Sequence, residues 1–282
     1  MTSSYQPLLG ASVVSLAVNV PGPAACARMV RLGASVLKLE PPGGDPLEGQ
    51  NPSWYRELAA GQDVVRIDLK SDTGRAALSE RLARSDILLT SHRPSALGRL
   101  GLAWPALHER FPRLCQVAIV GFPAPHEEVA GHDLTYLAAE GLLSPPTMPR
   151  TLMADLAGAD QAVGAALGLL LQRGRDGRGS YFAVALSDAA RWFSQPLRHG
   201  LTMAGSQLNG GFAGYNLYPA RSGWVAVAAL EPHFWAGLLR EAGLDNAVYA
   251  DLAALFATRD ASDWEAWALE RDLPISAVRD DL

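Results

Sequence analysis

The sequence predicts an α/β fold in which a large domain with a parallel sheet is followed by a smaller α+β domain. A short apolar strand over residues 13–17 is followed by a helix over 24–32 and a second strand over 35–39. A strand, a helix and a strand joined by tight turns form a βαβ unit, whose strands run parallel. Glycines become frequent after residue 199, so a second domain is expected beyond that point. A chain of 282 residues, 49% of them hydrophobic, is long enough for both.

The expected large domain, residues 1–198, continues the alternation of strands and helices. Asp72 is expected to cap a helix over residues 73–83, because a side-chain oxygen at this position accepts backbone N–H bonds. A long helix over residues 156–172 is apolar on every side and is therefore expected to be buried. Further strands are expected over residues 64–69, 86–90, 114–121 and 180–186.

The expected small domain covers residues 215–282 and follows a glycine-rich linker over residues 199–214. Paired strands are expected over residues 215–218 and 224–229, joined by a turn at Ser222-Gly223. Glu231-Pro232 is then expected to begin a helix that ends at residue 242, and shorter helices are expected over 247–257 and 261–271.

Composition excludes several classes of protein. The net charge of −5 and the isoelectric point near 5.7 argue against a nucleic-acid partner, which would require clustered Lys and Arg. No apolar run is expected to be long enough to cross a bilayer, and the N-terminus lacks the pattern of a signal peptide. We therefore expect a cytoplasmic protein with neither a nucleic-acid nor a membrane partner.

Two further motifs can be assessed directly. Cys26 and Cys115 lie in apolar segments without the spacing of zinc ligands, so buried free thiols are expected. The first strand–helix joint, residues 20–22, does not read GxGxxG, so the sequence gives no support for a dinucleotide cofactor.

The stretch from Gly131 to Asp155 holds the residues best suited to chemistry. His132 and Asp155 each stand at an expected junction of loop and helix. A histidine and a carboxylate in such positions are what proton transfer requires. A structural explanation is also open, in which Asp155 caps the helix that follows and His132 is a hydrogen-bonded turn residue.

Two cations lie near the carboxyl ends of expected strands, where ligands gather in open α/β sheets. Lys38 is in the second strand, and Arg93 follows the strand over residues 86–90. Both could hold a phosphorylated ligand, or they could be ordinary charged residues at the rim of the sheet.

A series of short segments carries a likeness to a known family. The segments are PGP at 21–23, LGASVLKLEPPGGD at 32–45, IDLK at 67–70, RP at 93–94, LGL at 100–102, GF at 121–122 and RDGRG at 175–179. In this order the chain resembles the class III CoA-transferases of the CaiB-BaiF type, from about Pro7 to the C-terminus. The resemblance implies a Rossmann-like large domain, no prosthetic group, and coenzyme A as part of an acyl-CoA substrate.

Within that superfamily the closer resemblance is to the alpha-methylacyl-CoA racemases. It rests on GHDLTY at 131–136, MADLAG at 153–158 and ALEPHF at 229–234. The resemblance implies that His132, Asp155 and Glu231 are catalytic. It also implies that coenzyme A is contacted by Val20, Pro21, Lys38, Arg93 and Tyr136.

The implied reaction is racemisation or epimerisation of a 2-methylacyl-CoA by 1,1-proton transfer. His132, with Glu231 beside it, would serve one face of the α-carbon and Asp155 the other. The enolate oxygen would lie near the N-terminus of the helix that follows Asp155. An alternative is a CoA-transferase in which Asp155 is the nucleophile and forms an acyl anhydride.

The chain departs from the family pattern in ways that keep a third reading open, that of a non-catalytic partner subunit. A basic Arg-Gly-Lys-Lys/Arg cluster of the family is replaced by AGQD at residues 60–63, which removes cations that help to hold the CoA phosphates. Asp160 stands near Asp155 and would raise its proton affinity if it pointed inward.

A homodimer is expected, because the long apolar helix and a set of aromatic residues offer apolar surface. In the family the chain returns from the small domain to the large one, and two such rings interlock. This sequence ends about where the return would begin, so a dimer without the closed link is expected. The aromatic residues are Trp192, Phe193, Trp235, Trp264 and Trp267.

Overall fold

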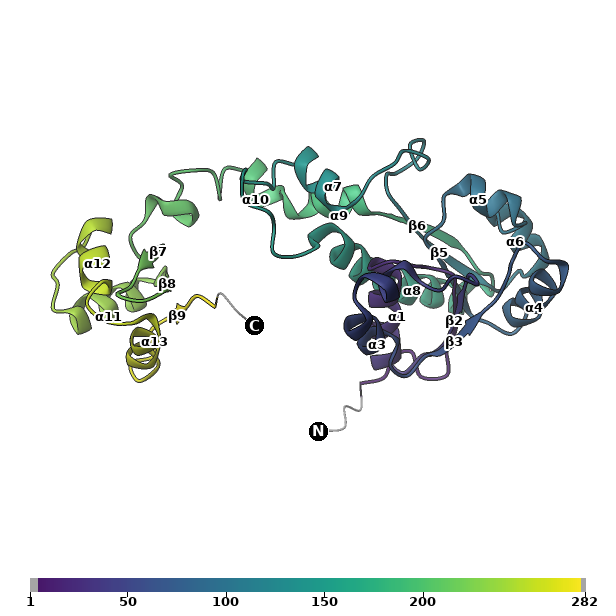
Figure 1. The fold of residues 1–282 in the computed structure, drawn as a ribbon, viewed down its shortest axis with the longest axis horizontal. Coiled ribbons are helices and arrows are strands. Elements are labelled where there is room, and N and C mark those ends of the chain that lie inside the picture. Colours follow the sequence, from purple (N-terminus) through teal and green to yellow (C-terminus); the bar gives the residue numbers. More distant parts are fainter. Residues whose placement is uncertain (1–4, 280–282) are drawn as a thin grey trace. The chain divides into compact units, whose positions relative to one another are not determined.

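The computed structural model describes residues 5–279. The chain divides into two compact units, one that ends at Ser194 and one that begins at Gln195 (Figure 1). The expected boundary at residue 198 lies four residues further along the chain, just after the short helix α10 (Gln195–Arg198).

The first unit is built on a six-stranded sheet in the order β3-β2-β1-β4-β5-β6, and every neighbouring pair is parallel. This confirms the predicted α/β fold class. Strand order reverses between β1 and β4, and in such sheets the carboxyl ends of the strands at the reversal form a ligand site. The strands are β1 (Ser12–Ser15), β2 (Ser35–Glu40), β3 (Asp63–Arg66), β4 (Ile87–Thr90), β5 (Cys115–Val120) and β6 (Tyr181–Ala185).

Helices cover both faces of the sheet. Successive strand residues point to opposite sides, so neighbouring residues of one strand pack into different core clusters. Val13 packs into the core cluster formed with α1 (Pro21–Arg31) and α8 (Met153–Asp176). Its neighbour Val14 packs into the cluster on the other face, with α4 (Asp72–Leu82), α5 (Pro94–Arg99) and α6 (Trp104–Arg110). Cys26 and Cys115 are buried free thiols, as predicted.

Several helix boundaries differ from those predicted. The first helix, α1, begins at Pro21, whose fixed backbone suits a first helical position. Ser71, and not Asp72, caps α4, since its hydroxyl accepts the N–H of Gly74. The short helices α2 (Pro46–Gln50) and α3 (Pro52–Ala59) were not predicted; each starts at a proline behind an Asp or Asn cap.

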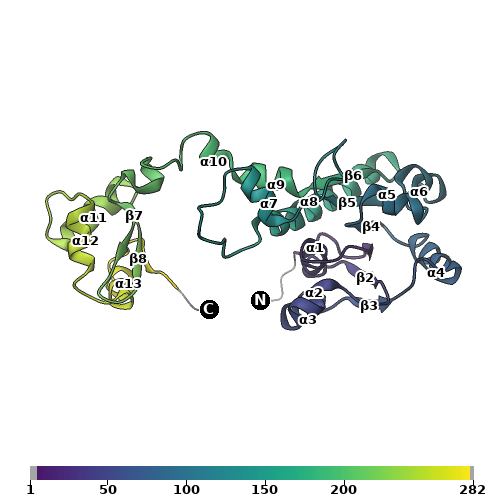
Figure 2. The same cartoon turned by 45° about the horizontal axis from the view of Figure 1, so that its top comes forward.

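The long helix α8 begins three residues earlier than predicted and is buried along one face only. It packs against α1, α7 (Asp133–Ala139) and α9 (Leu186–Phe193), and it lies over β5 and β6 (Figure 2). Leu171, on the other side, is 69% exposed, so the prediction of burial on all sides was wrong. The buried face consists of Ala154, Gly158, Ala159, Ala162, Val163, Ala166 and Leu169.

By length and composition α8 could cross a membrane, contrary to the expectation that no segment reaches that length. It is the one described helix that meets this test. Of its most apolar window, 44% is buried inside the protein. The core helix of a folded domain passes the same test, so the finding is weak evidence for a membrane segment.

The second unit contains an antiparallel sheet of three strands, β7 (Tyr215–Pro219), β8 (Trp224–Ala228) and β9 (Ile275–Ala277). The first two strands were predicted and β9 was not. The sheet shares a core with helices α11 (Pro232–Ala242), α12 (Tyr249–Phe256) and α13 (Ala261–Leu269). Trp264 is 2% exposed in this core, whereas Trp192 of the first unit is 69% exposed. Dimer formation through the exposed aromatic residues stays a prediction.

Candidate active site

A pocket of about 160 Å³ opens at the carboxyl ends of β1, β4 and β5, where the strand order reverses. His132 and Asp155 both line it, so the structure brings these two predicted residues to one cavity. Its walls also include the loop after β1, the loop after β4 and the loop before α7. The other lining residues are Val18, Asn19, Pro21, Ser91, Arg93, Ile119, Val120, Gly121, Glu127, Val129, Gly131, Tyr136 and Leu186.

His132 immediately precedes α7 and has an extended backbone. Its N–H donates to Oγ1 of Thr135 at 3.0 Å, and its carbonyl accepts the N–H of Thr135 at 2.8 Å. These two bonds fix the turn through the main chain and leave the imidazole exposed, without a hydrogen-bond partner among the described residues. The ring is therefore available to a ligand in the pocket.

Asp155 is the third residue of α8 and not its cap, because the helix begins at Met153. Burial raises the pKa of the Asp155 carboxyl to about 7, and the negative charge of Asp133 adds to the rise. Near neutral pH the carboxyl is thus divided between its protonated and ionised forms. A group in this state can both give and take a proton.

Asp133 is a residue of this site that the sequence analysis did not single out. Its side chain is 4% exposed, and Oδ1 accepts the backbone N–H of Asp155 at 3.0 Å. The other oxygen, Oδ2, is buried without a partner among the described residues. Asp160, expected to act on Asp155 if it pointed inward, instead pairs with Arg28 at 2.7 Å and is 55% exposed. In the sequence, the position of Asp133 directly after His132 was the feature that could have indicated its place in the site.

Tyr136 is 2% exposed and forms part of the pocket wall. Its side chain approaches two glycines closely: a Cβ on Gly121 would lie 2.6 Å from the hydroxyl oxygen, and a Cβ on Gly131 would lie 2.5 Å from a ring carbon. Burial raises the pKa of the phenol to about 12, so Tyr136 stays neutral. The same residue also lines a neighbouring cavity of about 480 Å³ with Phe122 and Val129.

A larger cavity of about 690 Å³ lies at the ends of β1 and β2, on the side of the sheet covered by α4 and α5. Its lining includes Pro41 and Pro42 and the cations Lys70, Arg75 and Arg99, and these three cations outnumber the two carboxylates that also line it, Glu40 and Asp68. The sequence analysis did not single out these cations, because residues from three separate segments meet only in the folded chain.

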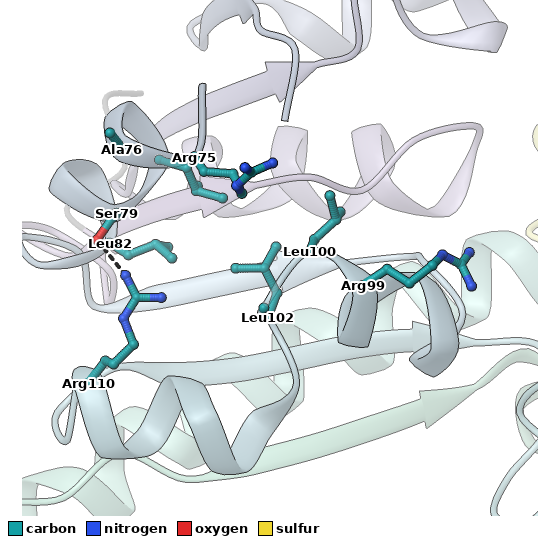
Figure 3. Close-up of a pocket in the computed structure, with 10 residues that line it drawn as sticks. Arg75, Ala76, Ser79, Leu82, Arg99, Leu100, Leu102 and Arg110 are labelled. Atoms are coloured by element: carbon teal, nitrogen blue, oxygen red, sulfur yellow. Dashed lines mark hydrogen bonds between the residues drawn. The ribbon is translucent and has the colours of Figure 1, made fainter. Parts of the chain in front are cut away.

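A third cavity of about 470 Å³ shares part of its lining with the larger one, and Figure 3 shows the residues around it. The two cavities share Arg75, Arg99 and Leu100. The guanidinium of Arg110 enters from α6 and donates to Oγ of Ser79 at 2.8 Å. Together the two cavities form a cationic region large enough for a phosphorylated ligand.

Comparison with known proteins shows the family to which the chain belongs. The family model described as CoA-transferase family III matches residues 8–281. The chain belongs to CoA-transferase family III.

Relatives within the family differ in activity. The chain is 32% identical over 259 residues to the alpha-methylacyl-CoA racemase of Mus musculus, covering 85% of this chain and 65% of that protein. It is 33% identical over 205 residues to the cinnamoyl-CoA:phenyllactate CoA-transferase of Clostridium sporogenes, covering 65% of this chain and 50% of that protein. The chain thus spans about two thirds or less of the length of these relatives.

The fold is also that of a solved family member. A CAIB/BAIF family protein from Brucella suis superposes with a TM-score of 0.82 at 22% identity, over 98% of this chain and 85% of that one. At this identity the likeness concerns the fold alone.

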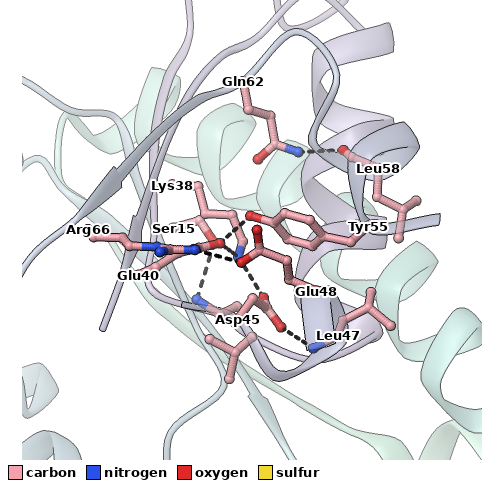
Figure 4. A network of polar contacts seen from close by, with 12 residues as sticks. Ser15, Lys38, Glu40, Asp45, Leu47, Glu48, Tyr55, Leu58, Gln62 and Arg66 are labelled. Carbon is pink, nitrogen blue, oxygen red and sulfur yellow. Dashed lines mark hydrogen bonds and ion pairs between the residues drawn. The ribbon is translucent and has the colours of Figure 1, made fainter. Parts of the chain in front are cut away.

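Among the residues expected to contact coenzyme A, Lys38 is buried in an ion-pair cluster. Its Nζ lies 2.5 Å from Oε1 of Glu40 and 2.6 Å from Oδ2 of Asp45, and the side chain is 1% exposed (Figure 4). Tyr55 donates its hydroxyl to the same Glu40 oxygen. The charge of this ammonium is thus offset within the protein, and a contact of Lys38 with coenzyme A stays a prediction.

The other expected contacts have different surroundings. Val20 is buried in a small cluster with Leu47 and Tyr55, and its contact with coenzyme A stays a prediction. Pro21 and Arg93 line the pocket beside Asp155, and Arg93 is exposed. Both residues are therefore placed where a ligand in the pocket could contact them.

Glu231, the third expected catalytic residue, belongs to the second unit. It is exposed and directly precedes α11. Its catalytic role stays a proposal.

Proposed function

We propose that this member of CoA-transferase family III is a racemase or epimerase of 2-methylacyl-CoA thioesters. The observation that carries the proposal is the shared pocket of His132 and Asp155, which supplies an imidazole and a carboxyl to one small space. Inversion of an α-carbon by 1,1-proton transfer needs a base on one face and an acid on the other.

In the proposed reaction one of the two groups takes the α-proton, and the thioester becomes an enolate. The other group then gives a proton to the opposite face of the same carbon. Neutral His132 accepts a proton on its ring and Asp155 donates from its protonated form; the roles exchange for the other enantiomer. Glu231 of the second unit is proposed as a third catalytic acid.

The pKa of Asp155 supports this cycle. A carboxyl with a pKa of about 7 is protonated in a large fraction of molecules at neutral pH and is also a stronger base than an ordinary aspartate. Both properties suit the removal and return of a weakly acidic proton.

Binding of the coenzyme A part is assigned to the two cationic cavities, the larger of which is lined by His92, between Ser91 and Arg93 of the pocket. Lys70, Arg75 and Arg99 offer charge to phosphates, and Pro41 and Pro42 offer an apolar surface. This assignment does not require Lys38 as a phosphate contact. Because the cations come from residues 70–99, binding would not depend on the basic cluster missing at 60–63.

A second candidate is a CoA-transferase in which the Asp155 carboxylate attacks the thioester and forms an acyl anhydride. The observation in its favour is that Asp155 itself lines the pocket, and a relative at 33% identity is named as a transferase. Such a mechanism needs a nucleophile and does not need the imidazole of His132.

Two assays separate the candidates. Incubation of 2-methylacyl-CoA with the protein in deuterated water is expected to place deuterium at the α-carbon and to interconvert the enantiomers. Hydroxylamine added with acyl-CoA should trap no protein-bound acyl group; a hydroxamate on Asp155 would establish the transferase instead. Calorimetry with coenzyme A tests the remaining reading, since the absence of heat at high concentration would indicate a non-catalytic partner subunit.

A further inference from the structure

Asn19 is an unusual residue in the pocket wall. It lies in the loop between β1 and α1 and lines the same cavity as Asp155 and His132. Its φ of 64° is left-handed, a conformation that only one other described residue besides glycines adopts, Asp272 with a φ of 53°. Left-handed residues other than glycine persist where the surrounding structure holds them, and they concentrate at functional sites.

A buried group of charges holds this backbone conformation. The N–H of Asn19 donates to Oδ1 of Asp45 at 3.0 Å, and the same oxygen accepts the N–H of Leu47 at 3.0 Å. The other oxygen of Asp45 pairs with Lys38 (Figure 4). Asp45 therefore joins the pocket loop to the enclosed ammonium. On the other side of the loop, Oγ of Ser91 accepts the N–H of Val18 at 3.0 Å.

The side-chain amide of Asn19 is left exposed in the pocket, and no described residue hydrogen-bonds to it. A carboxamide held on a fixed backbone, beside a group that moves protons, suits the recognition of a carbonyl oxygen. The amide of Asn19 would add a side-chain donor to the backbone N–H groups expected near the enolate oxygen at the start of α8.

We propose that Asn19 is a substrate-orienting residue whose side-chain amide donates a hydrogen bond to the thioester carbonyl, with Asp45 and Lys38 as the positioning residues behind it. This rests on the proposed binding of acyl-CoA. It also gives Lys38 a role in the reaction that differs from the phosphate contact expected from the sequence.

Binding of two ligands tests the proposal without any turnover. Coenzyme A lacks a carbonyl beyond the sulfur, whereas S-acetonyl-CoA carries one and cannot acylate Asp155. Calorimetry should show that the wild-type protein binds S-acetonyl-CoA more tightly than coenzyme A. Asn19→Gly, which keeps a left-handed backbone without strain, should weaken S-acetonyl-CoA about tenfold and leave coenzyme A unchanged. Equal binding of the two ligands by the wild type, or an unchanged ratio in Asn19→Gly, would overturn the proposal.

Asp272→Gly is the matched control, because it relieves the same kind of backbone strain in the second unit. It should change neither affinity. Asp45→Ala should lose the same preference for the carbonyl ligand, and it should cause no further loss when combined with Asn19→Gly. If Asp45→Ala does not fold, the ratio measured for Asn19→Gly decides alone.

The outcome also separates this inference from the proposed function. If the wild type binds coenzyme A and Asn19→Gly keeps the preference for S-acetonyl-CoA, only the role of Asn19 is contradicted. A protein that binds neither ligand contradicts the acyl-CoA function itself. In the exchange assay, Asn19→Gly should lower kcat/KM for acyl-CoA about tenfold, because the substrate loses the same hydrogen bond as S-acetonyl-CoA.

Discussion

The backbone N–H of Asp155 donates to Oδ1 of Asp133 at 3.0 Å, and the charge of the same Asp133 helps to raise the pKa of the Asp155 side chain. One carboxylate thus fixes the first turn of α8 and biases the protonation of a residue in that turn. The pair joins two helices, α7 and α8, at the pocket.

Asp133→Asn should lower the pKa of Asp155, because the amide oxygen can still accept the backbone bond while the charge is gone. Burial is the larger cause of the shift, so the pKa should stay above that of an ordinary aspartate. The pH profile of kcat/KM for α-proton exchange reports this change, and the limb assigned to Asp155 should move to lower pH. Asp160→Asn is the control and should leave the profile in place, since Asp160 is exposed and paired with Arg28.

Stability should depend on pH through Asp155. Its pKa is raised from 3.8 to about 7 in the folded protein, so the folded state binds the proton more tightly than the unfolded one. The resulting stabilisation is complete below the unfolded pKa and is lost as pH rises through about 7. Urea titrations at pH 5 and pH 8 should show a loss for the wild type that is smaller in Asp155→Asn. An equal loss in both proteins would contradict the pKa assigned here.

Lys38→Met should destabilise the first unit strongly. The substitution leaves Glu40 and Asp45 buried together without their cation, and breaking a buried pair in this way costs about 3–5 kcal/mol. Arg84→Met is the control: Arg84 is 79% exposed and pairs with the exposed Glu80, so its loss should cost less than about 1 kcal/mol. The free energy of unfolding in urea measures both. Similar values for the two variants would argue against the enclosed ammonium.

Gly131→Ala should disturb the pocket, because the added Cβ would lie 2.5 Å from the ring of Tyr136. Displacement of the buried ring should cost about 1–3 kcal/mol and reduce α-proton exchange. Gly168→Ala on α8 has no atom within 4 Å of the added Cβ and should stabilise the helix by about 0.5–1 kcal/mol. Thermal unfolding of the two variants should therefore shift in opposite directions.

Much of the architecture follows from local pattern. The βαβ unit around α1 and the strands of the parallel sheet were predicted because apolar runs of strand length are bounded by turn residues. Helix starts were less accurate. Several helices begin at prolines close to a preceding strand or turn, and the proline was assigned to the loop.

The site was predicted only in part, for a physical reason. His132 and Asp155 could be placed together because their motifs resemble those of a known family. The burial of Lys38 could not be foreseen, since it depends on Asp45, which caps α2, and Tyr55 of α3, which enclose the ammonium. Arg75 and Arg99 likewise share a cavity only through the packing of α4 against α5.

The central claim is that His132 and Asp155 serve opposite faces of one carbon. It is tested most directly by single-enantiomer exchange in deuterated water with the variants His132→Gln and Asp155→Asn. Each variant should still exchange the α-proton of one enantiomer, a different one for each variant, and neither should interconvert the two. Loss of exchange for the same enantiomer in both variants, or racemisation at the wild-type rate in either, would contradict the account.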